Sequence, residues 1–105
     1  MDNRHGFILV AQQAGQVVAA AYVSTIMSVE HGGESVWLEE IYVLPEFREQ
    51  GVGSALVHAA LDHARAAGYR AIDLEVDATH ERAANLYERL GFVRMSRTRY
   101  VARIQ

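Results

Sequence analysis

The stretch from Arg48 to Ser54 has the residue types and the spacing that bind an anion. It reads Arg-Glu-Gln-Gly-Val-Gly-Ser and lies between an expected strand and the start of an expected helix. Gly51 and Gly53 carry no side chains, so the backbone amides at the helix start are open to a ligand. The helix dipole adds roughly half a positive charge at this end. Ser54 offers a further donor and Arg48 a positive charge, and the loop therefore predicts a phosphate site.

The loop alone does not identify the ligand, because Gly-x-Gly also occurs in ordinary turns. A dinucleotide-binding fingerprint needs a third glycine, and a Walker loop needs Gly-Lys-Ser or Gly-Lys-Thr; this stretch has neither. The alternative is a tight strand-to-helix turn in which the glycines serve only the backbone.

Two adjacent carboxylates, Glu39 and Glu40, interrupt an apolar strand between Leu38 and Ile41. A carboxylate among apolar neighbours is costly to desolvate unless it has a role or a partner. The pair therefore predicts a functional carboxylate, or else one solvent-facing and one salt-bridged glutamate. Strict alternation groups Val36, Leu38, Glu40 and Tyr42 on one face, and Trp37, Glu39, Ile41 and Val43 on the other.

The composition narrows the chemistry. The chain has 105 residues, half of them apolar, which predicts one domain spanning residues 1–105. All ten basic residues are arginines and there is no cysteine, so a basic catalyst must be a histidine, a carboxylate, the N-terminal amine or a tyrosine. The net charge of −3 disfavours a nucleic-acid partner. The five histidines lack the spacing of a three- or four-ligand zinc site, so we expect no metal.

Hydropathy gives no sign of a membrane protein. No apolar run reaches the roughly 18 residues that a membrane span needs, and no secretory leader is recognisable. We therefore expect a cytoplasmic protein with no membrane partner.

The periodicity of apolar residues predicts alternating strands and helices behind these motifs. The expected strands are Phe7–Ala11, Val17–Val29, Val36–Val43, Ile72–Val76 and Phe92–Ile104, and the expected helices are Val52–Ala67 and Glu81–Leu90. The order is β-β-β-α-β-α-β, and its strand–helix–strand unit requires a right-handed parallel crossover. The fold class is α+β, close to a three-layer α/β arrangement, with a mixed, mainly antiparallel sheet and one parallel β-α-β crossover.

Two motifs resemble those of the GNAT acyltransferase superfamily. Val43 to Gly53 resembles the acetyl-coenzyme A signature, which is Val-x-Pro followed by Arg/Gln-x-x-Gly-x-Gly/Ala. Ala83 to Phe92 resembles the family's second helix, which ends in Tyr-x-x-x-Gly-Phe. The resemblance covers residues 7–104 and includes the element order. It implies a GNAT-like fold, here lacking the strand and two helices that usually precede the strand at Phe7.

The resemblance implies an N-acetyltransferase that moves an acetyl group from acetyl-coenzyme A to a primary amine of a small molecule or peptide, without a metal. In the family, the pantetheine arm pairs with the strand that corresponds to Val36–Val43, which implies a role for the backbone of Ile41 and Val43. His80 stands where the family often has an asparagine near the cofactor. The implied cofactor-binding residues are Ile41, Val43, Arg48, Glu49, Gln50, Gly51, Val52, Gly53, Ser54 and His80.

The implied catalytic residues are Glu39, Glu40 and Tyr87. Residues 38–43 resemble the strand of diamine acetyltransferases that carries an acidic pair beside the acetyl group. This resemblance favours Glu39 as the base, with Glu40 as the second candidate, and it favours a cationic acceptor. Tyr87 resembles the family's helix tyrosine that faces the coenzyme sulfur, which implies a general acid; the alternative is a tyrosine that only packs.

Three functions remain open from the sequence. The first is the N-acetyltransferase. The second is a catalytically weak acyl-coenzyme A-binding or regulatory module that needs a partner to complete the acceptor site. The third and weakest is an adaptor that uses the arginines near the C-terminus. Both faces of the Val17–Val29 strand are rather apolar, and an uncovered apolar face associates, so we expect a homodimer or a covering partner chain.

Overall fold

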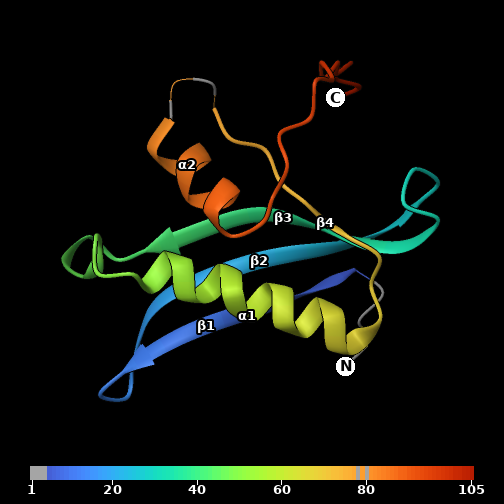
Figure 1. Ribbon diagram of the computed structural model, residues 1–105. Helices are drawn as coiled ribbons and strands as arrows, with labels where there is room; N and C mark the ends of the chain where they lie inside the picture. The colour runs from blue at the N-terminus through green and yellow to red at the C-terminus, as the bar shows by residue number, and fades with distance from the viewer. Residues whose placement is uncertain (1–4, 78, 80) are drawn as a thin grey trace. The chain divides into compact units, whose positions relative to one another are not determined.

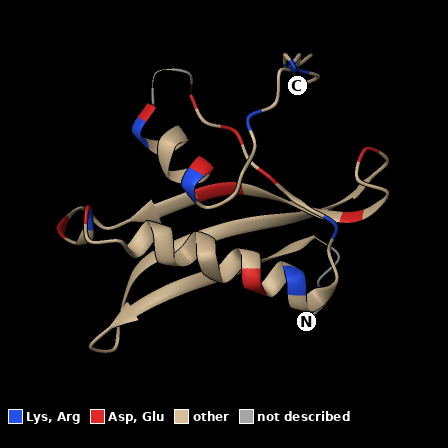
Figure 2. Ribbon diagram, in the orientation of Figure 1, with Lys and Arg blue, Asp and Glu red and all other residues tan. Residues whose placement is uncertain are grey.

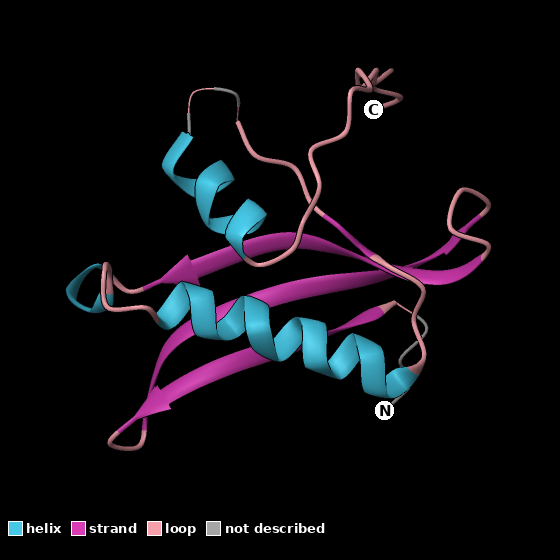
Figure 3. Ribbon diagram, viewed as in Figure 1, coloured by secondary structure: helices cyan, strands magenta, loops and turns pink. Residues whose placement is uncertain are grey.

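The computed structural model describes residues 5–77, 79 and 81–105. Its strands are β1 (Gly6–Gln13), β2 (Gln16–Ser28), β3 (Gly33–Val43) and β4 (Ile72–Asp73), and its helices are α1 (Val52–Ala67), α2 (Glu81–Arg89) and the short 3-10 helix η1 (Pro45–Phe47) (Figure 1, Figure 3). The chain divides into two compact units, Met1–Glu75 and Val76–Gln105. The first contains the sheet and α1, and the second contains α2.

The first unit is a four-stranded mixed sheet in the order β1-β2-β3-β4. The first three strands form an antiparallel meander, and β4 runs parallel to β3 after the α1 crossover. This confirms the predicted mixed sheet with one parallel crossover. The helix α1 lies across one face of β1, β2 and β3 (Figure 1).

The core lies between α1 and the sheet and is made of small and β-branched side chains. Fully or almost fully buried are Val18, Ala19, Ala21, Val23, Val36 and Leu38 from the sheet and Leu56, Val57, Ala60 and Ala64 from α1. Alanines on both surfaces let the helix backbone approach the strands closely. The helix ends at Gly68 in the left-handed conformation, whose N–H donates to the carbonyls of Ala64 and Arg65, as the C-cap glycine predicts. Neither α1 nor α2, the helices of the described residues, has the length and apolar character to cross a bilayer.

Two predicted strands are wrong in extent or in kind. The fourth strand is limited to Ile72–Asp73 and does not continue to Val76. The predicted strand over Phe92–Ile104 is absent from the described residues of the second unit. A strand needs a neighbouring backbone to satisfy its N–H and C=O groups, so an apolar, β-branched pattern without such a partner stays irregular.

Candidate active site

The loop before α1 leaves a row of backbone amides without helical partners. The first helical hydrogen bond runs from the N–H of Ala55 to the carbonyl of Gly51, at 3.0 Å, and no side chain caps the helix. The N–H groups of Val52, Gly53 and Ser54 precede that bond, so the helix itself cannot satisfy them. Gly51 has a φ of 83°, a left-handed conformation that favours glycine. This is the donor set that an anion such as a diphosphate requires.

The protein's own backbone and packing do not require a glycine at position 53. Its φ is not positive, so its backbone conformation does not demand glycine. A Cβ at this position would meet only a methyl group of Val43, at 3.9 Å, which is an ordinary contact. The protein would therefore accept a side chain here, whereas a ligand lying against the amides would not. The geometry fits the predicted cradle for a phosphate group.

The loop is held in shape by its own contacts. The N–H of Phe47 donates to the carbonyl of Leu44 at 2.9 Å, and the side-chain amide of Gln50 donates to the carbonyl of Glu46 at 3.0 Å. Glu49 has a φ of 61°, a conformation that non-glycine residues adopt uncommonly and that often marks functional loops. The loop is thus pre-shaped before any ligand arrives.

Arg48 is fixed at the end of β3. Its Nε donates to the carbonyl of Val43 at 2.9 Å, and its guanidinium carbon lies 5.4 Å from the ring centroid of Tyr42, a cation–π distance. The side chain remains exposed. Its predicted contact with a phosphate stays a prediction.

A β-bulge in β3 lies at the acidic pair. Tyr22 pairs with Glu40 whereas Val23 pairs with Leu38, so Glu39 is an extra residue in β3. The predicted strict alternation is therefore wrong beyond Leu38. Leu38 is buried beneath α1, and Val43, which alternation places on the opposite face, instead lies against Gly53 of α1.

The bulge brings both glutamates to the sheet face that lies away from α1. Glu40 lies opposite Tyr22, whose neighbours in β2 are buried beneath α1. Glu39 accepts a hydrogen bond from the hydroxyl of Ser24, with 2.6 Å between Oγ and Oε2. Both glutamates are exposed, and no ion pair joins either to another described residue. The alternative of one solvent-facing and one salt-bridged glutamate is therefore wrong.

Beyond its short pairing with β4, one edge of β3 pairs with no strand of the described residues. That pairing involves only Val36 and Trp37 of β3. The N–H of Leu44 donates to Val18 of β2 at 2.9 Å, so by alternation Ile41 and Val43 turn their backbone groups the other way. Arg48 meets the Val43 carbonyl on that side. An extended ligand can add to such an edge as a further strand.

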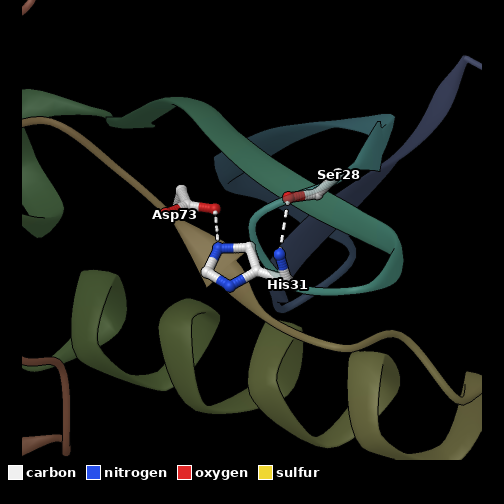
Figure 4. A network of polar contacts seen from close by, with 3 residues as sticks. All are labelled: Ser28, His31 and Asp73. Atoms are coloured by element: carbon white, nitrogen blue, oxygen red, sulfur yellow. Dashed lines mark hydrogen bonds and ion pairs between the residues drawn. The ribbon is translucent and has the colours of Figure 1, made fainter.

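A second polar cluster ties the β2–β3 turn to β4. Nε2 of His31 lies 2.9 Å from Oδ2 of Asp73, and the backbone N–H of His31 donates to the hydroxyl of Ser28 at 3.1 Å (Figure 4). Sequence reasoning places His31 in a turn and misses this contact, because no local pattern links residues 42 positions apart. The pair joins the end of β4 to the turn of the β2–β3 hairpin. Across the described residues, no three His, Cys, Asp or Glu side chains are grouped as metal ligands.

Tyr87 lies on α2 in the second unit. It is half-buried, and this burial raises the pKa of its phenol above 10.0. Its ring meets the ring of Phe92 edge-on, with 5.7 Å between centroids, and its carbonyl accepts the N–H of Phe92 at 3.0 Å. The phenol is therefore protonated at neutral pH, the form that a general acid needs. His80, the remaining predicted cofactor residue, lies outside the described residues.

Comparisons with known proteins agree with the two sequence motifs. The model of the acetyltransferase (GNAT) family matches residues 1–92. The chain is 48% identical over 56 residues to a mycothiol acetyltransferase of Propionibacterium freudenreichii, covering 50% of this chain and 18% of that protein. It is 33% identical over 92 residues to the mouse protein named probable N-acetyltransferase family 8 member 5, covering 88% of this chain and 40% of that protein.

Solved structures share the fold. An aminoglycoside N-acetyltransferase in complex with coenzyme A superposes with a TM-score of 0.75 and 25% identity, covering 91% of this chain and 74% of that chain. The chain spans less than two thirds of the length of the first curated relatives that it matches. Because the family model extends over most of the chain, the chain belongs to the acetyltransferase (GNAT) family.

Proposed function

We propose that this chain binds acetyl-coenzyme A and transfers its acetyl group to a primary amine. The observation that carries the proposal is the row of amides at Val52, Gly53 and Ser54, which lack helical partners and follow a strand with an open edge. In this proposal the amides hold the pyrophosphate, and the backbone of Ile41 and Val43 pairs with the pantetheine arm. The related structure that contains coenzyme A supports coenzyme A as the ligand.

Glu39 is the proposed base. The acceptor must lose a proton before its nitrogen can attack, because an ammonium ion has no lone pair. Glu39 takes that proton, directly or through a water molecule, as the carbon–nitrogen bond forms at the thioester carbonyl. An exposed carboxylate on the bulge of β3, held by Ser24, supports the choice.

Tyr87 is the proposed acid. The carbon–sulfur bond breaks and leaves a thiolate, which takes a proton from the Tyr87 phenol. A thiol with an ordinary pKa near 8.5 is a fair leaving group by itself, so this proton transfer is the smaller contribution. The place of Tyr87 in the helix motif supports the assignment; the phenol is protonated at neutral pH, and its raised pKa makes it a weaker acid than an ordinary tyrosine.

The proposed acceptor is a cationic amine. From Gly6 to Val43 the chain has no arginine or lysine, whereas four glutamates lie in β3 and in the turn before it (Figure 2). The residues of this segment therefore carry only negative formal charge, which favours a protonated amine over an anionic one; Arg48, over Tyr42 at the end of β3, is a positive charge beside it. Solved relatives named as aminoglycoside acetyltransferases are consistent with such an acceptor.

The second candidate is an acyl-coenzyme A-binding module that needs a partner. The sheet face away from α1 favours an association, because Ile8, Val10, Tyr22 and Tyr42 are each between 44% and 63% exposed there. The expected homodimer stays a prediction. Sedimentation at micromolar concentration tests it, and a monomer would contradict it.

A thiol-release assay separates the two functions. Acetyl-coenzyme A is offered with 1,4-diaminobutane, kanamycin, ethanolamine and a tripeptide, and free thiol is measured with and without each amine. The enzyme releases thiol only with an amine, and fastest with a dicationic or polycationic one. Binding of coenzyme A without release with any amine would favour the binding module.

A further inference from the structure

We propose that Ser24 is a positioning residue for the base: its hydroxyl holds the carboxylate of Glu39 in the orientation that accepts the amine proton. The inference rests on the proposed role of Glu39. The observation that supports it is a hydrogen bond in which Oγ of Ser24 donates to Oε2 of Glu39, with 2.6 Å between the two atoms. The two residues are 15 positions apart in the chain. Such a short bond to an ionised acceptor is stronger than a bond between neutral groups.

The bulge explains why Glu39 needs this support. A regular strand residue has a cross-strand neighbour that restricts its side chain. Glu39 has none, because it is the extra residue between the pairs Val23–Leu38 and Tyr22–Glu40. Ser24 lies one pair further along β2, opposite Trp37, and its side chain points to the same face. The Ser24 hydroxyl therefore restricts the Glu39 side chain, which has no cross-strand neighbour at the bulge to do so.

The hydrogen bond from Ser24 also gives the two carboxylate oxygens of Glu39 different roles. Oε2 is occupied by the Ser24 hydroxyl, while Oε1 has no partner among the described residues. A base needs one free oxygen lone pair aimed at the proton and a fixed carboxylate plane. The arrangement meets both needs.

The same geometry separates the two candidate bases. Glu40 lies in register opposite Tyr22 and accepts no hydrogen bond from a described side chain. The strand sets the direction of the Glu40 side chain, but no described side chain holds its carboxylate in one orientation. Ser24 thus distinguishes Glu39 from Glu40, which the sequence leaves as alternatives.

The test is a kinetic cycle with Ser24→Ala, Ser24→Thr, Glu39→Gln and the double variant Ser24→Ala/Glu39→Gln. The substrates are acetyl-coenzyme A and the amine of the four-member panel that reacts fastest. We expect Ser24→Ala to lower kcat about 10-fold with an unchanged KM for acetyl-coenzyme A. Ser24→Thr keeps the hydroxyl, and threonine is favoured in strands, so we expect kcat to stay at the wild-type value. In the Glu39→Gln background Ser24→Ala has no further effect.

The outcomes distinguish the inference from the proposal beneath it. Wild-type turnover in Glu39→Gln would remove Glu39 as the base, whatever Ser24 does. A large loss in Glu39→Gln together with wild-type turnover in Ser24→Ala would overturn the positioning role alone. Equal losses in Ser24→Ala and Ser24→Thr, or a loss in the double variant that exceeds Glu39→Gln, would show that Ser24 acts through stability instead. Melting temperatures of all four variants identify that last case.

Discussion

The two units of the chain differ in the interactions that stabilise each of them internally. In the first unit, four strands pair in one sheet, β3 and β4 across the α1 crossover, and the buried apolar side chains of the described residues lie between Val18 and Ala64. In the second unit, α2 buries no residue completely, and its ring contact joins Tyr87 to Phe92, only five positions apart. The first unit therefore fixes the proposed coenzyme cradle and the proposed base rigidly, whereas the acid depends on local structure.

The largest expected effect is a charge change in the first unit's cradle. Gly53→Asp puts a carboxylate against the proposed pyrophosphate, while Gly53→Asn has nearly the same shape without the charge. We expect Gly53→Asp to weaken coenzyme A binding at least about 100-fold; Gly53→Asn should weaken it less, because it crowds the ligand without adding a charge. Titration calorimetry measures both affinities. Wild-type affinity in both variants would mean that no phosphate lies there.

The next largest effect is expected at the β3 bulge, where substitutions of Glu39 and Glu40 are compared. Glu39→Gln keeps the shape and removes the base, so kcat should fall about 100-fold in the thiol-release assay. Glu40→Gln is the matched control, and its effect should appear mainly in the KM for a cationic amine. If Glu40→Gln gives the larger loss of kcat, the base has been assigned to the wrong glutamate.

A smaller effect is expected from the second unit. Tyr87→Phe keeps the edge contact with Phe92 and removes the proton, so kcat should fall about 10-fold while the melting temperature is retained. Unchanged kcat would leave the second unit without a role in the chemistry.

The pH dependence of Tyr87 follows from its burial. Because desolvation raises its pKa above 10.0, the folded phenol stays protonated at pH values where an unfolded tyrosine ionises. Its contribution to stability is therefore complete below pH 10 and is lost as the pH rises beyond 10. The activity should likewise show no loss from tyrosine ionisation below pH 10. A decline that is present in wild type, absent in Tyr87→Phe and centred below pH 10 would contradict this.

The smallest effect concerns the clasp between the β2–β3 turn and β4. Asp73→Asn weakens the partly buried contact with His31, in which the side chains are 28% and 24% exposed, and should lower the free energy of unfolding by about 1 kcal/mol. Asp62→Asn is the matched control, since its pair with Arg65 is 77% and 71% exposed and such pairs contribute little. Urea unfolding measures both, and equal values would mean that the clasp adds nothing to the first unit.

The sequence predicts the locally determined parts of this fold well. The helix α1 begins and ends where the apolar spacing and Gly68 indicate, and α2 ends within one turn of its predicted end. The loop at Gly51 and Gly53 is equally local, because its geometry depends on residues that follow one another in the chain. These features need no distant partner, so a pattern of neighbouring residues is enough to predict them.

The missed features all depend on distant partners. The bulge at Glu39 arises from the register with β2, the clasp joins His31 to Asp73, and the bond from Ser24 crosses between strands. The segment Phe92–Ile104 has a strand-like pattern but no pairing in the described chain. A pattern of alternation cannot reveal where a partner strand skips a residue or is missing.

The most direct measurement of the central claim is a titration of isotopically labelled protein with coenzyme A, followed by amide resonances in NMR spectra. The account predicts that the amides of Val52, Gly53 and Ser54 shift most strongly, and that inorganic pyrophosphate moves the same three. Strong shifts elsewhere with these three amides unmoved would contradict the proposed cradle.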